Sequence, residues 1–193
     1  MNRPALGPYP NPQAMNRALT DVLRAQAHER PGISVDSLRR QFAYDRLLTR
    51  VFTRPDAERW VLKGATAMLA RLAGDARHTR DIDLYRLDSD LIAAEDALRT
   101  AATVDAGDFF RFALSPARRI TQDRHTVRVP VVAYLGVREY SRFHVDLVTD
   151  LTMTAPPDEV MPLVSLAFGR SYDHHLSRLP DCRPHRRQGL RND

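Results

Sequence analysis

The chain contains very little lysine and cysteine. Of its 29 lysine and arginine residues only Lys63 is a lysine, so arginine supplies almost all of the positive charge. A GC-rich genome accounts for such a bias, and arginine also suits bidentate contacts to phosphate. The single cysteine, Cys182, excludes an internal disulfide and is typical of proteins in a reducing compartment.

The chain also lacks a long apolar run. No stretch approaches the roughly 18 residues that a membrane-spanning helix needs. No signal-like apolar core follows the first basic residue, so we expect no export, no membrane partner and a cytoplasmic location. The 193 residues are 43% hydrophobic and carry a net charge of +5. These values predict one domain with a buried core, and the charge favours polyanionic partners.

Composition divides the chain into three parts. Residues 1–12 predict a disordered lead-in, residues 13–166 carry the regular patterns of the domain, and residues 167–193 form an atypical basic tail. Apolar periodicity predicts helices over 13–29, 34–52, 64–72 and about 89–100, the last capped by Asp88 or Ser89. It predicts strands over 60–62, around Asp81 and Asp83, and over 109–114, 126–135 and 142–148, with a hairpin connection at 136–140. The expected fold class is mixed α/β (α+β), with a mixed sheet flanked by helices.

The block from Trp60 to Leu84 is the most informative part of the sequence. A glycine turn at Gly64 opens a short helix, which leads into a strand that carries Asp81 and Asp83. Residues two apart on a strand point to the same face, so these two carboxylates repel each other unless a cation lies between them. Mg²⁺ held by two carboxylates and substrate phosphates is the usual arrangement. Free backbone N–H groups after Gly64 can bind those phosphates.

A third acid, Asp146, lies on the predicted strand 142–148, on the same face as His144. A further carboxylate near the pair suits nucleotidyl transfer, where it can activate a hydroxyl as a base. Two other interpretations stay open. Asp146 can pair across the sheet with Arg128 or Arg142, and Asp81 and Asp83 can be exposed strand acids paired with Arg80 and Arg77.

The segments 60–65 and 77–84 resemble the abortive-infection nucleotidyltransferase toxins (AbiEii type), and the helix over 35–52 is similar to that family too. The resemblance covers roughly residues 35–150. It implies a polymerase-beta-like nucleotidyltransferase fold and a toxin of a type IV-like toxin–antitoxin system. It further implies a transferase that uses Mg²⁺ to add nucleotides from an NTP to the 3′ acceptor end of tRNA, which inhibits translation. The implied partners are the NTP, with pyrimidine nucleotides among the candidates, tRNA and a cognate antitoxin protein.

The resemblance also assigns roles to residues. Asp81 and Asp83 are the implied metal ligands, and together with Asp146 they are the implied catalytic residues. The implied nucleotide-binding residues are Lys63, Gly64, Ala65 and Thr79.

The sequence departs from the family at two places. Ala65 follows Gly64 where the family has glycine or serine, so a phosphate contact there must come from the backbone N–H. No lysine follows Lys63, whereas the family carries a later helix with a functional lysine and a further aspartate. A one-base frame shift over residues 172–193, with permitted codons, can spell a segment similar to that helix, which predicts an altered reading frame.

Two alternative functions therefore stay open. The chain can be a catalytically weakened or inactive member that binds an antitoxin or RNA, for which Arg118, Arg119, Arg124 and Arg128 are a candidate RNA-facing patch. A metal-dependent phosphohydrolase is a further possibility. No Ser/His/Asp or Cys/His nucleophile set is recognisable, which disfavours covalent hydrolase chemistry.

Overall fold

The computed structural model describes residues 9–63, 81–87, 90–120, 125–150, 158–160 and 179–181. The predicted helix over 64–72 lies outside this part of the chain, as do Gly64, Ala65 and Thr79. The helices are α1 (Pro12–Glu29), α2 (Val35–Phe52), the 3-10 helix η1 (Ala57–Arg59) and α4 (Leu91–Ala102). The strands are β1 (Trp60–Lys63), β2 (Asp81–Arg86), β3 (Phe110–Leu114), β4 (Arg118–Arg119), β5 (Thr126–Leu135), β6 (Arg138–Val148), β7 (Asp158–Val160) and β8 (Leu179–Asp181).

Each α-helix starts at a residue whose side chain accepts a hydrogen bond from the first turn. Asn11 caps α1 and Ser34 caps α2, which confirms the predicted starts of these helices to within a residue. The cap of α4 is Asp90, which accepts from the backbone N–H of Ile92 at 2.9 Å. The predicted caps at Asp88 and Ser89 are therefore wrong by one or two positions.

The strands form one mixed sheet in the order β3-β5-β6-β2-β1-β8-β7, with β4 paired to β5. Strands β2 and β6 run parallel, as do β1 and β8, and the other neighbours are antiparallel. This confirms the predicted mixed sheet, although the sequence pattern did not predict β4, β7 or β8. Strand β6 begins at Arg138, four residues earlier than predicted, so only Gly136 and Val137 connect it to β5. Gly136 adopts φ +63°, and a Cβ there would meet Pro12 at 2.8 Å.

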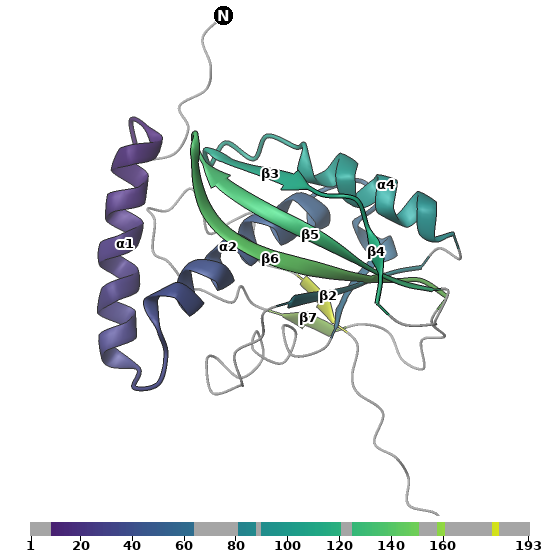
Figure 1. Ribbon diagram of the computed structural model, residues 1–193, viewed down its shortest axis with the longest axis horizontal. Helices are drawn as coiled ribbons and strands as arrows, with labels where there is room; N and C mark the ends of the chain where they lie inside the picture. The colour runs from purple at the N-terminus through teal and green to yellow at the C-terminus, as the bar shows by residue number, and fades with distance from the viewer. Residues whose placement is uncertain are drawn as a thin grey trace, which may run out of the picture.

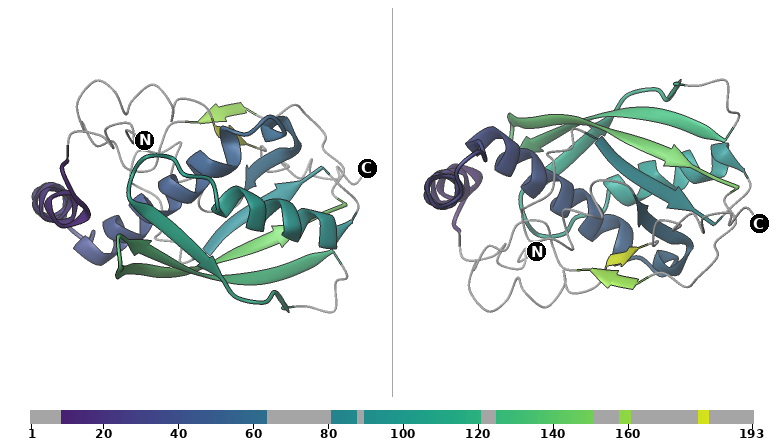
Figure 2. Two further views of the ribbon diagram at one scale, coloured as in Figure 1. Left: turned by 90° about the horizontal axis from the view of Figure 1, so that it is seen from above. Right: turned by 90° about the horizontal axis from the view of Figure 1, so that it is seen from below.

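Helices α2 and α4 pack together on one face of the curved sheet, and α1 packs against α2 at one end of the molecule (Figure 1, Figure 2). Strand β5 buries every second residue on the side of these helices, from Val127 to Leu135. The aromatic residues Phe42 and Trp60 are buried. The residues between the buried ones, including Asp81, Asp83, Arg128 and Asp146, lie on the opposite face of the sheet. Within the described ranges, no helix is both long and apolar enough to cross a membrane.

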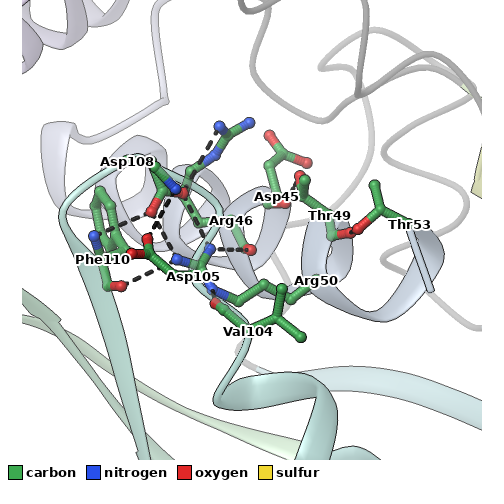
Figure 3. A network of polar contacts seen from close by, with 10 residues as sticks. Asp45, Arg46, Thr49, Arg50, Thr53, Val104, Asp105, Asp108 and Phe110 are labelled. Atoms are coloured by element: carbon green, nitrogen blue, oxygen red, sulfur yellow. Dashed lines mark hydrogen bonds and ion pairs between the residues drawn. The ribbon is translucent and has the colours of Figure 1, made fainter. Parts of the chain in front are cut away.

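A buried ion pair fastens α2 to the loop before β3 (Figure 3). The guanidinium of Arg50 donates to both carboxylate oxygens of Asp108, at 2.6 and 3.0 Å. It also donates to the carbonyl oxygens of Val104, Arg46 and Phe110, at 2.8 to 2.9 Å. These contacts use all five N–H groups of the guanidinium, which is how a charge can be kept in the core.

Candidate active site

The three predicted acids lie together on the face of the sheet that α2 and α4 do not cover. Parallel pairing of β2 with β6 places Asp83 directly opposite Asp146, and Asp81 directly opposite His144. Residues that face each other on neighbouring strands have adjacent side chains, and residues two apart share a face. The structure therefore brings Asp81, Asp83 and Asp146 into one cluster, although 60 residues or more of sequence separate the third acid from the pair.

Basic residues flank the acids on both sides. Antiparallel pairing of β1 with β2 places Lys63 opposite Asp83. On the other side, Arg128 of β5 lies opposite Asp146, and Arg118 of β4 lies opposite Arg128. The same face of the sheet thus carries a transverse row with the order base, acid, acid, base, base. Such a row can bind a polyanion together with a cation.

Arg128 contacts two of the acids directly. Its Nε donates to Oδ1 of Asp146 and its Nη2 to Oδ2 of Asp146, both at 2.7 Å. The same Nη2 donates to Oδ2 of Asp81 at 3.0 Å. Of the two pairings left open by the sequence, the one between Asp146 and Arg128 is therefore present, whereas Arg142 binds Glu139.

His144 contacts the remaining oxygen of Asp81. Its Nδ1 lies 3.1 Å from Oδ1 of Asp81, and it donates in the tautomer that carries a proton on Nδ1. The imidazole is partly exposed, so it lies beside the acid cluster and also reaches solvent. His144 and Arg128 were not predicted as site residues. Strand alternation places His144 on the face of Asp146, and the pairing of β5 with β6 brings Arg128 to that face.

The crowded charges alter the pKa of the central acid. Burial raises the pKa of Asp83 to about 6, and the negative charges of Asp146 and Asp81 add to that rise, while Lys63 and Arg128 oppose it. The hydrogen bonds to Asp146 raise the pKa of Arg128 above its usual value. Three carboxylates thus face two neighbouring cationic groups, and the cluster favours one more positive charge.

The donor set fits a divalent metal ion. Carboxylate oxygens are the ligands that Mg²⁺ prefers, and Asp81 and Asp83 are the predicted pair. In the part of the chain that the structure describes, no three His, Cys, Asp or Glu side chains are arranged to hold a metal. In the structure the guanidinium of Arg128 lies between Asp81 and Asp146 and contacts both carboxylates. The carboxylates fit the ion by their chemistry. In the structure Arg128 donates to Asp81 and Asp146, and His144 contacts Asp81.

Two solved structures resemble this architecture. The nucleotidyltransferase toxin MenT4 from Mycobacterium tuberculosis H37Rv matches with a TM-score of 0.58 and 18% sequence identity, over 85% of this chain and 54% of MenT4. JHP933 from Helicobacter pylori matches with a TM-score of 0.45 and 12% identity, over 79% of this chain and 54% of JHP933. The chain spans about half the length of these two proteins. The first match shows that the chain shares its fold with MenT4.

The family follows from the sequence match. The family model described as nucleotidyl transferase AbiEii toxin, type IV TA system, matches residues 46–177, more than half of the chain. The chain belongs to this family, as the block from Trp60 to Leu84 predicts. No curated protein is significantly similar to it in sequence.

Proposed function

We propose that the protein is the toxin of a toxin–antitoxin pair and transfers a nucleotide from an NTP to the 3′ end of tRNA. Addition at that end blocks aminoacylation and so inhibits translation. The tRNA and the cognate antitoxin are its partners in the cytoplasm, and pyrimidine nucleotides are among the candidate donors. Family membership and the nucleotidyltransferase fold support this proposal.

The main structural support for this proposal is the cluster of Asp81, Asp83 and Asp146 on adjacent strands, with Lys63 opposite Asp83. Nucleotidyl transfer needs charge neutralisation and in-line positioning more than covalent help from the protein. Asp81 and Asp83 would hold Mg²⁺, and the bound ion would neutralise charge on the phosphates. Lys63 lies beside them and suits the negative triphosphate.

The proposed reaction makes and breaks one bond each. The 3′ oxygen of the tRNA forms a bond to the α-phosphorus of the NTP, the bond from that phosphorus to the bridging oxygen of the β-phosphate breaks, and pyrophosphate leaves. The proton of the 3′ hydroxyl passes to Asp146 or to water, and Asp146 alternatively completes the metal site. Gly64, Ala65 and Thr79 bind the phosphates through N–H and hydroxyl groups in this proposal.

Incubation with each labelled NTP, Mg²⁺ and total tRNA tests the proposal. We expect labelled, lengthened tRNA with the wild-type chain and loss of at least 10³-fold with Asp81→Ala, because one acid of the pair cannot replace the other. Arg142→Gln is the matched control, since Arg142 binds Glu139 outside the cluster. An absence of tRNA lengthening by the wild-type chain, or equal labelling by Asp81→Ala, would contradict the proposal.

The contact of Arg128 with two acids favours a second candidate, an inactive member that acts by binding an antitoxin or RNA. In that case Asp83→Ala keeps both the toxicity and the antitoxin binding of the wild-type chain. Loss of toxicity with retained antitoxin binding in Asp83→Ala excludes this candidate.

A further inference from the structure

One guanidinium and one imidazole together occupy every carboxylate oxygen of two acids in the cluster. Arg128 binds both oxygens of Asp146 at 2.7 Å and one oxygen of Asp81 at 3.0 Å. His144 Nδ1 lies 3.1 Å from the other oxygen of Asp81. A divalent cation bound to these acids needs the same oxygens, so it competes with Arg128 for them.

Arg128 is positioned so that it can leave. Its side chain is 33% exposed, and the side chains of Asp81 and Asp146 are 28% and 13% exposed. Water and ions can therefore reach the contact. Arginine also stays charged in all accessible conditions, so it cannot release the acids by losing its proton.

Without a metal ion, the three carboxylates repel one another unless another cation lies among them. Asp83 and Asp146 face each other on neighbouring strands, and Asp81 shares their face. Like charges directly opposite each other destabilise a sheet. A cation held by the protein itself offsets this repulsion and keeps the carboxylates turned toward one another.

We propose that Arg128 is a positioning residue that takes the place of the divalent cation while the site is free of metal. On metal binding, the ion displaces the guanidinium from Asp81 and Asp146. This inference rests on the proposed function, in which Asp81 is a metal ligand and Asp146 can complete the metal site.

Binding of Mn²⁺ alone, without nucleotide, tests the inference on the full chain. Free Mn²⁺ is counted by electron paramagnetic resonance for the wild type, Arg128→Gln, Arg128→Lys and Arg118→Gln. Arg118 is the matched control because it lies next to Arg128 in the same row on the same face, and its removal takes away one charge there. Circular dichroism checks that each variant is folded.

We expect Arg128→Gln to bind Mn²⁺ about tenfold tighter than both the wild type and Arg118→Gln, because the competing guanidinium is gone. We expect Arg128→Lys to bind severalfold tighter than the wild type. Lysine keeps the charge but cannot make the planar bidentate contact. This variant separates competition for the oxygens from a general effect of charge.

Four results would overturn the inference. Weaker Mn²⁺ binding by Arg128→Gln would mean that Arg128 is needed in the metal-bound state. Equal affinity of Arg128→Lys and the wild type would leave only a charge effect. Equal Mn²⁺ affinity of all four chains would overturn the inference while leaving the proposed function intact, whereas no Mn²⁺ binding by any chain would contradict both.

A measurement on the wild type covers the case in which Arg128→Gln does not fold. The Arg128 Nε–H resonance, assigned by its loss in Arg128→Lys, is followed by NMR as Mg²⁺ is added. We expect its chemical shift to move and its exchange with water to accelerate as the metal binds. An unchanged resonance at saturating Mg²⁺, with binding verified by calorimetry, would show that the guanidinium stays in place and would overturn the inference.

Discussion

Two arginine–aspartate contacts of nearly the same length lie in very different surroundings. Arg50 approaches Asp108 to 2.6 Å, and Arg128 approaches Asp146 to 2.7 Å. The first pair is 0% and 1% exposed, and the second is 33% and 13% exposed. Contact distance therefore says little about the role of an ion pair, whereas burial and the balance of nearby charge say much.

The buried pair is saturated. Arg50 uses all its N–H groups on Asp108 and on three backbone carbonyls, and Asp108 also accepts from the N–H of Phe110 at 3.0 Å. In the partly exposed pair, one guanidinium is shared between two carboxylates. Arg128 binds both Asp146 and Asp81, and Asp83 lies beside them. Saturation makes the first pair a fixed structural element, and excess negative charge makes the second an exchangeable one.

The largest loss of stability is expected from breaking the buried pair of Arg50 and Asp108. Asp108→Ala leaves the Arg50 guanidinium buried without its counter-ion, which costs about 3–5 kcal/mol of unfolding free energy. Urea denaturation followed by circular dichroism measures this loss. Arg128→Gln in the same experiment is expected to lower the unfolding free energy by less than Asp108→Ala does, because water can reach the acids that lose the partly exposed guanidinium. Equal losses in the two variants would contradict the distinction between the pairs.

A smaller change in the unfolding free energy is expected when the pH is varied in the absence of metal. The pKa of Asp83 is raised to about 6 in the folded state, against about 3.9 in an unfolded chain. The folded state therefore holds this proton more tightly. The resulting stabilisation is complete below pH 4 and is lost as the pH rises through 6. After discounting for solvent screening, the loss is about 1–2 kcal/mol.

The control for this prediction is Asp83→Asn, which has no proton to lose. With EDTA present, thermal unfolding between pH 4 and 7 is compared for the wild type and the variant. The difference between their midpoints should grow as the pH rises, in favour of Asp83→Asn. A constant difference across this range would show that burial and the neighbouring acids do not raise the pKa of Asp83.

The smallest change in stability is expected from replacing a third arginine, Arg142. Arg142 binds Glu139 at 2.6 Å, but both side chains are exposed, at 71% and 42%. Exposed ion pairs of this kind often contribute nothing measurable. The urea midpoint of Arg142→Gln should therefore equal that of the wild type within error. A clear shift would show that exposure does not rank these three contacts.

Local patterns predicted most of the secondary structure. Apolar periodicity gave α1, α2 and α4 nearly to their ends, and it gave β5 from Thr126 to Leu135 without error. The short strands β4, β7 and β8 were missed because two or three residues are too few to show a period. Arg46 and Arg50 were missed as core residues, since charged side chains enter a core only where a distant partner such as Asp108 meets them.

The pairing of Arg128 with Asp146 depends on an irregularity that no local pattern shows. The register between β5 and β6 shifts by one residue between Ala133 and Tyr134, so that Tyr134 faces Glu139 while Ala133 faces Ser141. Without this bulge, Arg128 would lie opposite Val145. The bulged Tyr140 is buried, with its ring edge-on to Phe110, and this packing gives a physical reason for the shift.

The sequence by itself determined that Asp81 and Asp83 share one face of a strand and that Asp146 lies on one face with His144, because side-chain direction on a strand follows from backbone geometry alone. Tertiary structure decided that the two strands are parallel neighbours, that Asp83 meets Asp146, and that Arg128 reaches both Asp146 and Asp81. Strand order and register come from burial and packing across the whole sheet, so residues far apart in the chain meet only when the core has formed.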